Sequence, residues 1–95
     1  MTAYAIFIRE KMVDPAEVEN YKSLVGASMA GHAVTRLAAY GHHEVFEGAA
    51  MEGVVVLSFP TFDEAKAWYT SPAYLKAREH RFLGAQYRVV IVEGV

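Results

Sequence analysis

Three side chains of one predicted helix could bind an acid. Tyr74, Arg78 and Arg81 are spaced by four and three residues, so they share one face of a helix. Guanidinium groups bind carboxylates through paired hydrogen bonds, and a phenol adds a hydroxyl donor. This face therefore predicts a site for a small anionic metabolite. The alternative is a solvated helix face on which Arg81 forms an ion pair. Three glutamates are the candidate partners: Glu79, Glu47 and Glu93.

The segment AWYTSPAY, residues 67–74, crowds three aromatic rings into one short stretch. Trp68 falls on the stripe of its helix that faces the core, so we expect it to be buried. Tyr69 and Tyr74 flank the corner between two helices, where they could line a cavity beside Arg81. We therefore predict that Tyr69, Tyr74 and Arg81 bind the ligand. The alternative is that these rings only fill the corner, as aromatic clusters at helical spacing usually do.

Four histidines raise the question of a metal ion or of proton transfer. His42 and His43 are adjacent on a predicted strand, so their side chains point to opposite faces and cannot bind one ion together. His32 and His80 lack the spacing of a helical metal site, and the chain has no cysteine, so we expect no metal. A histidine that faces a cavity can act as a general base, and His42 is the candidate for that role. The alternative is a surface residue or a hydrogen-bonded wall of the cavity.

The composition argues against several classes of partner. The net charge is −2, and the nine Lys and Arg residues are scattered rather than gathered in the basic patch of a nucleic-acid-binding protein. No glycine-rich loop precedes a predicted helix, so we expect no nucleotide cofactor, and no other cofactor is indicated. The apolar run at residues 3–8 is far shorter than the ~18 residues of a membrane span, and no basic leader precedes it. We expect a cytoplasmic protein that binds neither nucleic acid nor membranes.

Strand and helix signals alternate along the chain. Strands are predicted where apolar and β-branched residues run together, and helices where an N-cap residue precedes apolar residues spaced by three and four. Ser71-Pro72 ends one helix and begins the next, because a residue before proline avoids helical torsion angles. Gly41 suggests a bulge or a close approach of the backbone within the second strand. The predicted elements are strand 3–11, helix 14–31, strand 37–47, strand 54–59, helix 61–70, helix 71–83 and strand 86–93.

This order of elements predicts one α+β domain over residues 1–95. Two βαβ units with right-handed crossovers give a ferredoxin-like antiparallel sheet, βαββαβ, with all helices on one face. Three of the four strands are apolar on both sides, and 54% of the residues are hydrophobic, so the other face also needs cover. We expect a homodimer in which two sheets pack face to face as a dimeric α+β barrel, with at least ~800 Å² buried per partner.

Several segments together resemble a known family over nearly the whole chain. They are DPAEVENY (14–21), EVFEG (44–48), SFPTFDEAKAWYTSPAY (58–74) and VVIVEGV (89–95). Arg81, seven residues after the end of AWYTSPAY, completes the pattern. The combination resembles the small proteins grouped as domain-of-unknown-function family 1330. The resemblance implies a ferredoxin-like domain of the dimeric α+β-barrel superfamily and no established reaction.

The chain departs from that family pattern around the second predicted strand. Members tend to carry Gly-Gly before this strand and Arg-Gly-Gly within it. This chain has Ala33-Val34 and Ala39-Tyr40-Gly41 at those places. The departure predicts a cavity that is narrower or differently shaped than is typical of the family.

Two functions are consistent with these patterns. The first is a dimeric protein that binds a small, acidic metabolite between sheet and helices, with His42 as a proton-transfer group. Analogy with the superfamily implies cofactor-free oxygenase or isomerase chemistry for such a cavity. The alternative is a non-catalytic module for dimeric association or regulation, whose interior would be filled by side chains.

Overall fold

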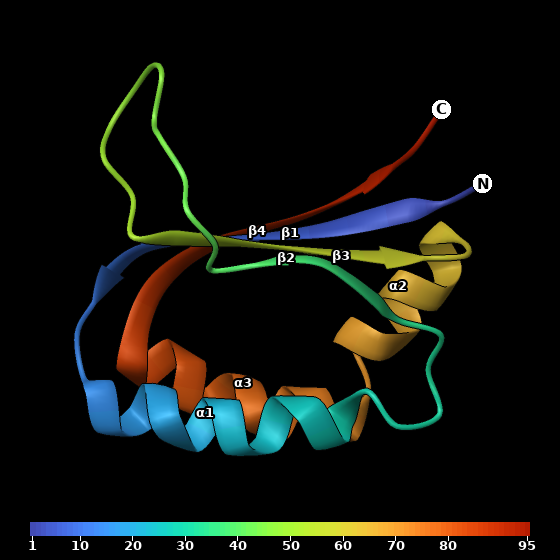
Figure 1. The fold of residues 1–95 in the computed structure, drawn as a ribbon. Helices are drawn as coiled ribbons and strands as arrows, with labels where there is room; N and C mark the ends of the chain where they lie inside the picture. Colours follow the sequence, from blue (N-terminus) through green and yellow to red (C-terminus); the bar gives the residue numbers. More distant parts are fainter.

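A four-stranded antiparallel sheet carries three helices on one of its faces (Figure 1). The structure, a computed structural model, describes residues 1–95. The strand order is β2-β3-β1-β4, which is the ferredoxin-like order, so the predicted α+β fold class is confirmed. The elements are β1 (Ala3–Met12), α1 (Pro15–Ser28), β2 (Thr35–Ala39), β3 (Gly53–Phe59), α2 (Phe62–Tyr69), α3 (Pro72–Gly84) and β4 (Ala85–Glu93).

Each helix begins at the N-cap residue that the sequence predicts. The side chain of Asp14 accepts a hydrogen bond from the Ala16 amide at 3.1 Å, and α1 starts at the next residue. Thr61 caps α2 and Ser71 caps α3 in the same way, through side-chain oxygens that accept from amides three residues later. These caps are local interactions, so they define where each helix begins without a contribution from packing against the sheet.

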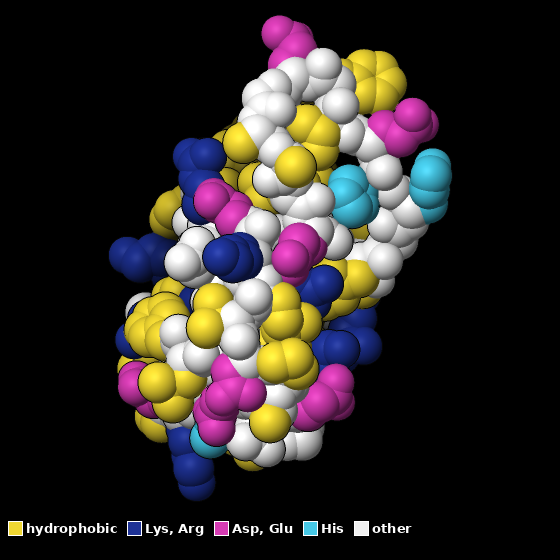
Figure 2. All heavy atoms as spheres, turned by 90° about the vertical axis from the view of Figure 1, so that its left-hand side faces the viewer, with side chains coloured by type: hydrophobic (Ala, Val, Ile, Leu, Met, Phe, Trp, Pro, Cys, Tyr) yellow, Lys and Arg dark blue, Asp and Glu magenta, His cyan; other side chains and the backbone are white.

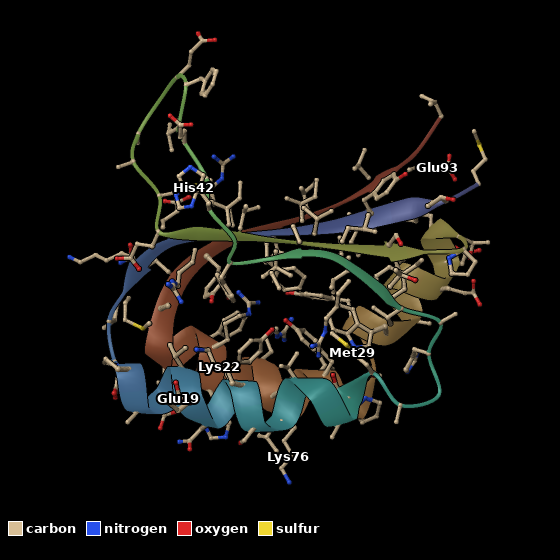
Figure 3. All side chains as sticks on the ribbon, in the orientation of Figure 1. Glu19, Lys22, Met29, His42, Lys76 and Glu93 are labelled. Carbon is tan, nitrogen blue, oxygen red and sulfur yellow. The ribbon has the colours of Figure 1, made fainter.

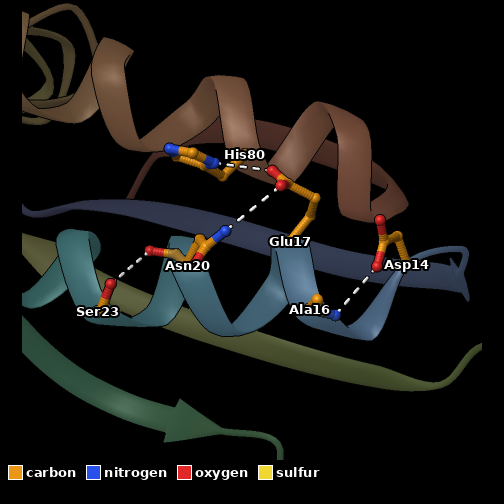
Figure 4. A network of polar contacts seen from close by, with 6 residues as sticks. All are labelled: Asp14, Ala16, Glu17, Asn20, Ser23 and His80. Carbon is orange, nitrogen blue, oxygen red and sulfur yellow. Dashed lines mark hydrogen bonds and ion pairs between the residues drawn. The ribbon is translucent and has the colours of Figure 1, made fainter.

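Helices α1 and α3 lie side by side beneath the sheet (Figures 1 and 4). Glu17 does not return to cap its own helix. Its carboxylate instead lies 2.8 Å from Nδ1 of His80 on α3 and accepts from Asn20 at 3.3 Å. At the end of α3, a Cβ on Gly84 would lie 2.9 Å from the backbone nitrogen of Val18, so only glycine permits this close approach. These contacts fix the distance between α1 and α3, and the two helices form one layer.

The second predicted strand is mostly a loop. The prediction of a strand over residues 37–47 is wrong beyond Ala39, where β2 ends. Tyr40 has φ +57°, a left-handed conformation that turns the chain out of the extended region and ends the ladder with β3. Residues 40–52 then rise from the face of the sheet that lacks helices (Figure 1), and Figure 2 shows histidine, acidic and hydrophobic side chains along this projecting loop. The bulge predicted at Gly41 lies instead between Arg36 and Ala38.

The core lies between the helices and one face of the sheet. The largest fully buried side chains are those of Trp68, Tyr74, Phe59 and Leu57. The Trp68 ring centroid lies 4.4 Å from that of Tyr74 and 5.6 Å from that of Phe59, and its Nε1 donates to Ser28 Oγ at 3.2 Å. The prediction that Trp68 is a core residue is therefore confirmed.

The opposite face of the sheet is apolar and has no helix over it (Figure 1). Ile6 of β1 is paired with Val56 of β3 on one side and with Val90 of β4 on the other, so the three side chains share this face. Val90 is 52% exposed. We call this surface the open face. No helix is long and apolar enough to cross a membrane.

Candidate functional site

A cavity of about 290 Å³ lies on the helix side of the sheet, between α1 and strands β2 and β3. Ten of its twelve lining residues are hydrophobic, and they include the core residues Phe7, Leu57 and Trp68. This volume is at the lower end of the range of small-molecule sites. The cavity is therefore suited to a small, largely apolar molecule.

Helix α1 supplies one wall of the cavity because of its residue spacing. Tyr21, Val25 and Met29 follow one another at intervals of four, which places them on the face of α1 turned toward the sheet. Figure 3 shows Met29 and Lys22 on that side of the helix, whereas Lys76 of α3 lies on the outer side of the helix layer. The same stripe that covers the core thus also lines the cavity.

The irregularity of β2 supplies the facing wall. Arg36 is paired with the buried Leu57, but the register then shifts by one residue so that Ala39 is paired with Val55. Because of this bulge, Arg36 and Ala39 both turn toward the helices, although they are three residues apart. Both residues line the cavity.

Tyr40 closes one end of the cavity. Its hydroxyl is hydrogen-bonded to that of Tyr87, and the guanidinium carbon of Arg9 lies 4.8 Å from its ring centroid. A Cβ on Gly53 would lie 2.5 Å from the Tyr40 ring, so glycine is required there. Tyr40 occupies a left-handed conformation at the position where the family resemblance places a glycine, which is the residue that adopts this conformation without strain. The departures at Ala39 and Tyr40 therefore contribute directly to the shape of the cavity, whereas neither Ala33 nor Val34 lines it.

A buried polar cluster lies behind the cavity wall. The hydroxyls of Tyr21 and Tyr74 are 3.0 Å apart, and Arg81 donates a hydrogen bond from Nη2 to the Tyr69 hydroxyl at 3.2 Å. The ring centroids of Tyr69 and Tyr74 are 4.9 Å apart. Among these groups only Tyr21 also lines the cavity. Tyr21 is therefore the one residue that the cavity and the cluster share.

Arg81 is a buried cation without a carboxylate partner. It is 3% exposed, its Nε has no hydrogen-bond partner, and none of the ion pairs includes it. Its guanidinium carbon lies 5.1 Å from the ring centroid of Tyr87, 5.2 Å from that of Phe82 and 5.7 Å from that of Phe7. These rings and the carbonyl end of α3 favour a positive charge. The alternative of an exposed Arg81 paired with a glutamate is therefore wrong.

The predicted ligand-binding residues are brought together, but not at the cavity surface. Tyr69, Tyr74 and Arg81 contact one another beneath the sheet, and none of them is among the lining residues. Arg78, on the same helix face, lies with its guanidinium carbon 4.8 Å from the Phe82 ring centroid.

His42 lies in the projecting loop of residues 40–52, far from this cluster. Its side chain is 89% exposed, and its Nε2 is 3.9 Å from a carboxylate oxygen of Glu44. Figure 3 shows it on the open-face side of the sheet, whereas the cavity lies on the helix side. His43 is next to it in the loop, where its Nε2 lies 3.3 Å from the Met51 carbonyl oxygen. No group of three or more His, Asp or Glu side chains is placed to bind a metal ion.

Three tyrosines are expected to ionise only at strongly alkaline pH. Burial is the main factor that raises the pKa of the Tyr21, Tyr40 and Tyr74 hydroxyls, and it exceeds the opposing effect of the Arg81 charge. The unfolded chain loses these protons near pH 10, whereas the folded chain keeps them, so their contribution to stability is present below about pH 10 and is lost as the pH rises above it. Absorbance at the phenolate band should show the phenols of Tyr21, Tyr40 and Tyr74 titrating only as the protein unfolds. The Tyr74→Phe variant should lack one of the late phenols, and titration of all six near pH 10 would contradict the burial of these hydroxyls.

Four residues at the cavity escaped the sequence-based prediction of a site. The sequence patterns single out none of Tyr21, Lys22, Arg36 and Tyr40 as ligand-binding groups. A signal existed for Lys22, since it follows the core-facing Tyr21 directly and so lies at the edge of the buried stripe. Arg36 gave no such signal, because the bulge that turns it and Ala39 to one side is not readable from the residue types.

The chain matches a family model over almost its entire length. The matching family carries the description "Domain of unknown function (DUF1330)", and the match covers residues 2–95. No curated protein matches the chain at a significant level.

Similar solved structures share the fold at low sequence identity. A protein of unknown function from Rhodopseudomonas palustris has a TM-score of 0.74 and 13% identity, over 99% of this chain and 82% of that chain. A dimeric protein of unknown function with a ferredoxin-like fold, from Bacteroides fragilis, has a TM-score of 0.65 and 15% identity, over 98% and 96%. SnoaB, a cofactor-independent oxygenase from Streptomyces nogalater, has a TM-score of 0.56 and 15% identity, over 99% and 91%. These likenesses agree with a ferredoxin-like α+β fold.

Proposed function

We propose that this chain, which belongs to the DUF1330 family of domains of unknown function, binds a small, largely apolar molecule in the cavity between α1 and the sheet. The observation that carries this proposal is an open cavity of about 290 Å³ beside the hydrophobic core. Interiors of small domains contain few voids larger than a water molecule. An apolar cavity of this size, with a few polar groups at its edge, is the usual form of a ligand site.

The groups at the cavity suit binding better than base catalysis. The hydroxyls of Tyr21 and Tyr40 can hydrogen-bond to a ligand, but burial raises the pKa of both, so they remain protonated at neutral pH. No His, Asp or Glu is among the lining residues. SnoaB supports the view that this fold can hold a small molecule, and its oxygenase activity belongs to that protein.

We assign the predicted residues Tyr69, Tyr74 and Arg81 a positioning role. Arg81 holds the Tyr69 hydroxyl, and Tyr74 is hydrogen-bonded to Tyr21. When one hydrogen bond already holds a hydroxyl, the direction of its remaining donor or acceptor position is fixed. The cluster thus orients the Tyr21 hydroxyl toward a ligand in the cavity.

The proposed active assembly is a homodimer formed through the open face. An apolar sheet face of this extent is normally covered, and no element of the chain covers it. The similar protein from Bacteroides fragilis is described as dimeric. Two open faces that pack together leave both helix-side cavities accessible, since each cavity lies on the other side of its own sheet.

Native mass spectrometry of the protein purified from its host tests the binding function. We expect a retained small molecule on the wild-type protein. Its mass should be absent from Val25→Trp, because the indole would fill the cavity from α1, and present in Ala27→Trp, whose position is exposed on the same helix and does not line the cavity. Equal retention by both variants would place the molecule elsewhere. A wild-type protein that retains nothing and takes up nothing from a metabolite extract would contradict the proposal.

A further inference from the structure

We infer that the ligand is an apolar carboxylic acid whose carboxylate is bound by Arg36 at the edge of the cavity, while Lys22, elsewhere in the lining, adds a second positive charge. This inference rests on the function proposed above and names the class of molecule. It differs from the acid site predicted on α3, because neither Arg78 nor Arg81 lines the cavity.

Arg36 is an exposed cation that has no charged partner. It is absent from every ion pair, and its only side-chain contact of hydrogen-bonding type is from Nη2 to the Met29 sulfur at 3.9 Å. The guanidinium therefore extends from β2 across to α1 over the cavity. Thioether sulfur is a weak acceptor, so most of the donors of Arg36 are available to a ligand.

Lys22 supplies the second positive charge of the lining, from α1. It is one of only two charged residues that line the cavity, the other being Arg36. Its ammonium lies 3.5 Å from a carboxylate oxygen of Glu19, where both side chains are more than half exposed. Lys22 precedes Met29, which Arg36 contacts, by seven residues, about 10 Å along the helix axis. Because of this separation, and because Glu19 partly neutralises Lys22, we expect Arg36 to contribute more.

The charge distribution around the cavity favours an anion. Its lining contains two cations and no carboxylate. The buried Arg81 adds an uncompensated positive charge behind Tyr21. Low-dielectric walls concentrate such a field at the opening. A guanidinium matches the planar geometry of a carboxylate, which it can bind through two parallel hydrogen bonds.

The residues deeper in the cavity determine the size and chemical nature of the rest of the ligand. Behind the two cations lie Leu57, Phe7 and Trp68, which offer aliphatic and aromatic surface only. A volume of about 290 Å³ accommodates a body of one ring or a short chain. Arylalkyl acids from phenylacetate to 5-phenylpentanoate have this form, and their primary amides retain the shape without the charge.

Paired titrations with these acids and their amides test the inference. Trp68 is the single tryptophan and lines the cavity, so its fluorescence reports binding at this site. For the acid that binds best, we expect affinity about tenfold higher than that of its amide at low ionic strength. In Arg36→Gln the acid should lose most of this advantage, in Lys22→Gln a smaller part of it, and in Lys76→Gln none. The affinity of the amide should change little in all three variants. Lys76 is the matched control because it lies on the outer side of the helix layer (Figure 3).

The possible outcomes separate this inference from the proposed function. If acids and amides bind equally, or if Arg36→Gln weakens both alike, the cavity binds ligands but does not select an anion, and the inference fails alone. If no acid or amide in the series perturbs Trp68, the cavity is not a site for such molecules and the inference fails together with the apolar ligand proposed above. A preference for the acid that persists in the double variant Lys22→Gln/Arg36→Gln would assign the anion to other residues and would also overturn it.

Discussion

Replacing Val90 with aspartate is expected to dissociate the proposed homodimer into monomers. Val90 lies on the open face, paired with Ile6, near the middle of the edge strand β4, and is 52% exposed in the isolated protomer. The carboxylate is therefore hydrated in the monomer but loses its water without gaining a partner when two sheets pack together. Two such charges per dimer should cost about 4 kcal/mol or more, which weakens association about a thousandfold. Sedimentation velocity should show the wild-type protein at twice the protomer mass of 10.5 kDa and the variant at that mass.

Leu83→Asp is the matched control for the dimer. Leu83 is also an exposed aliphatic residue, at 64%, but it belongs to α3 on the helix side of the sheet. It should leave the dimer intact. A wild-type protein that sediments as a monomer at micromolar concentration, or dissociation by both variants alike, would contradict assembly through the open face.

Replacing Trp68 with alanine is expected to remove much of the stability of the fold. The indole is fully buried and contacts the rings of Phe7, Phe59 and Tyr74, and the cavity beside it prevents the core from closing over the space it leaves. Truncation of a buried tryptophan costs about 3–5 kcal/mol, which is a large part of the roughly 5–15 kcal/mol of a typical domain. Urea unfolding followed by circular dichroism at one fixed protein concentration measures the difference, since the stability of a dimer depends on concentration.

Ser28→Ala separates the hydrogen bond of Trp68 from its packing. Ser28 Oγ accepts from the indole at 3.2 Å, and its removal leaves a buried donor unsatisfied. We expect a loss of about 1–3 kcal/mol, smaller than that of Trp68→Ala. If Trp68→Ala costs less than Ser28→Ala, the indole does not contribute to the core by packing as described.

The helices and most strands could be predicted because their signals are local. Asp14, Thr61 and Ser71 each bond to an amide two or three residues away, so the N-cap residue alone indicates where the helix begins. The second strand could not be predicted in the same way. Its end depends on Tyr40 adopting φ +57°, which is held by contacts with Tyr87, Arg9 and Gly53 on three other segments.

The burial of Arg81 could not be predicted from the sequence either. Helical spacing correctly placed it on one face with Tyr74, and the two residues do lie together. Spacing does not state how a helix is rotated against the sheet, and the rotation of α3 buries this face instead of exposing it. The guanidinium therefore meets aromatic rings and the Tyr69 hydroxyl rather than an acid from solvent.

The order of the elements, the starts of the three helices, the ferredoxin-like fold class and the burial of Trp68 could be predicted from the sequence, because capping and periodicity involve residues within about four positions of one another. Where a ligand could enter depends on tertiary packing. Lys22 and Arg36 line the same cavity because the bulge in β2 turns Arg36 toward the helices, across from α1. This arrangement depends on how a helix packs on a sheet, and no pattern within either segment specifies the distance between them.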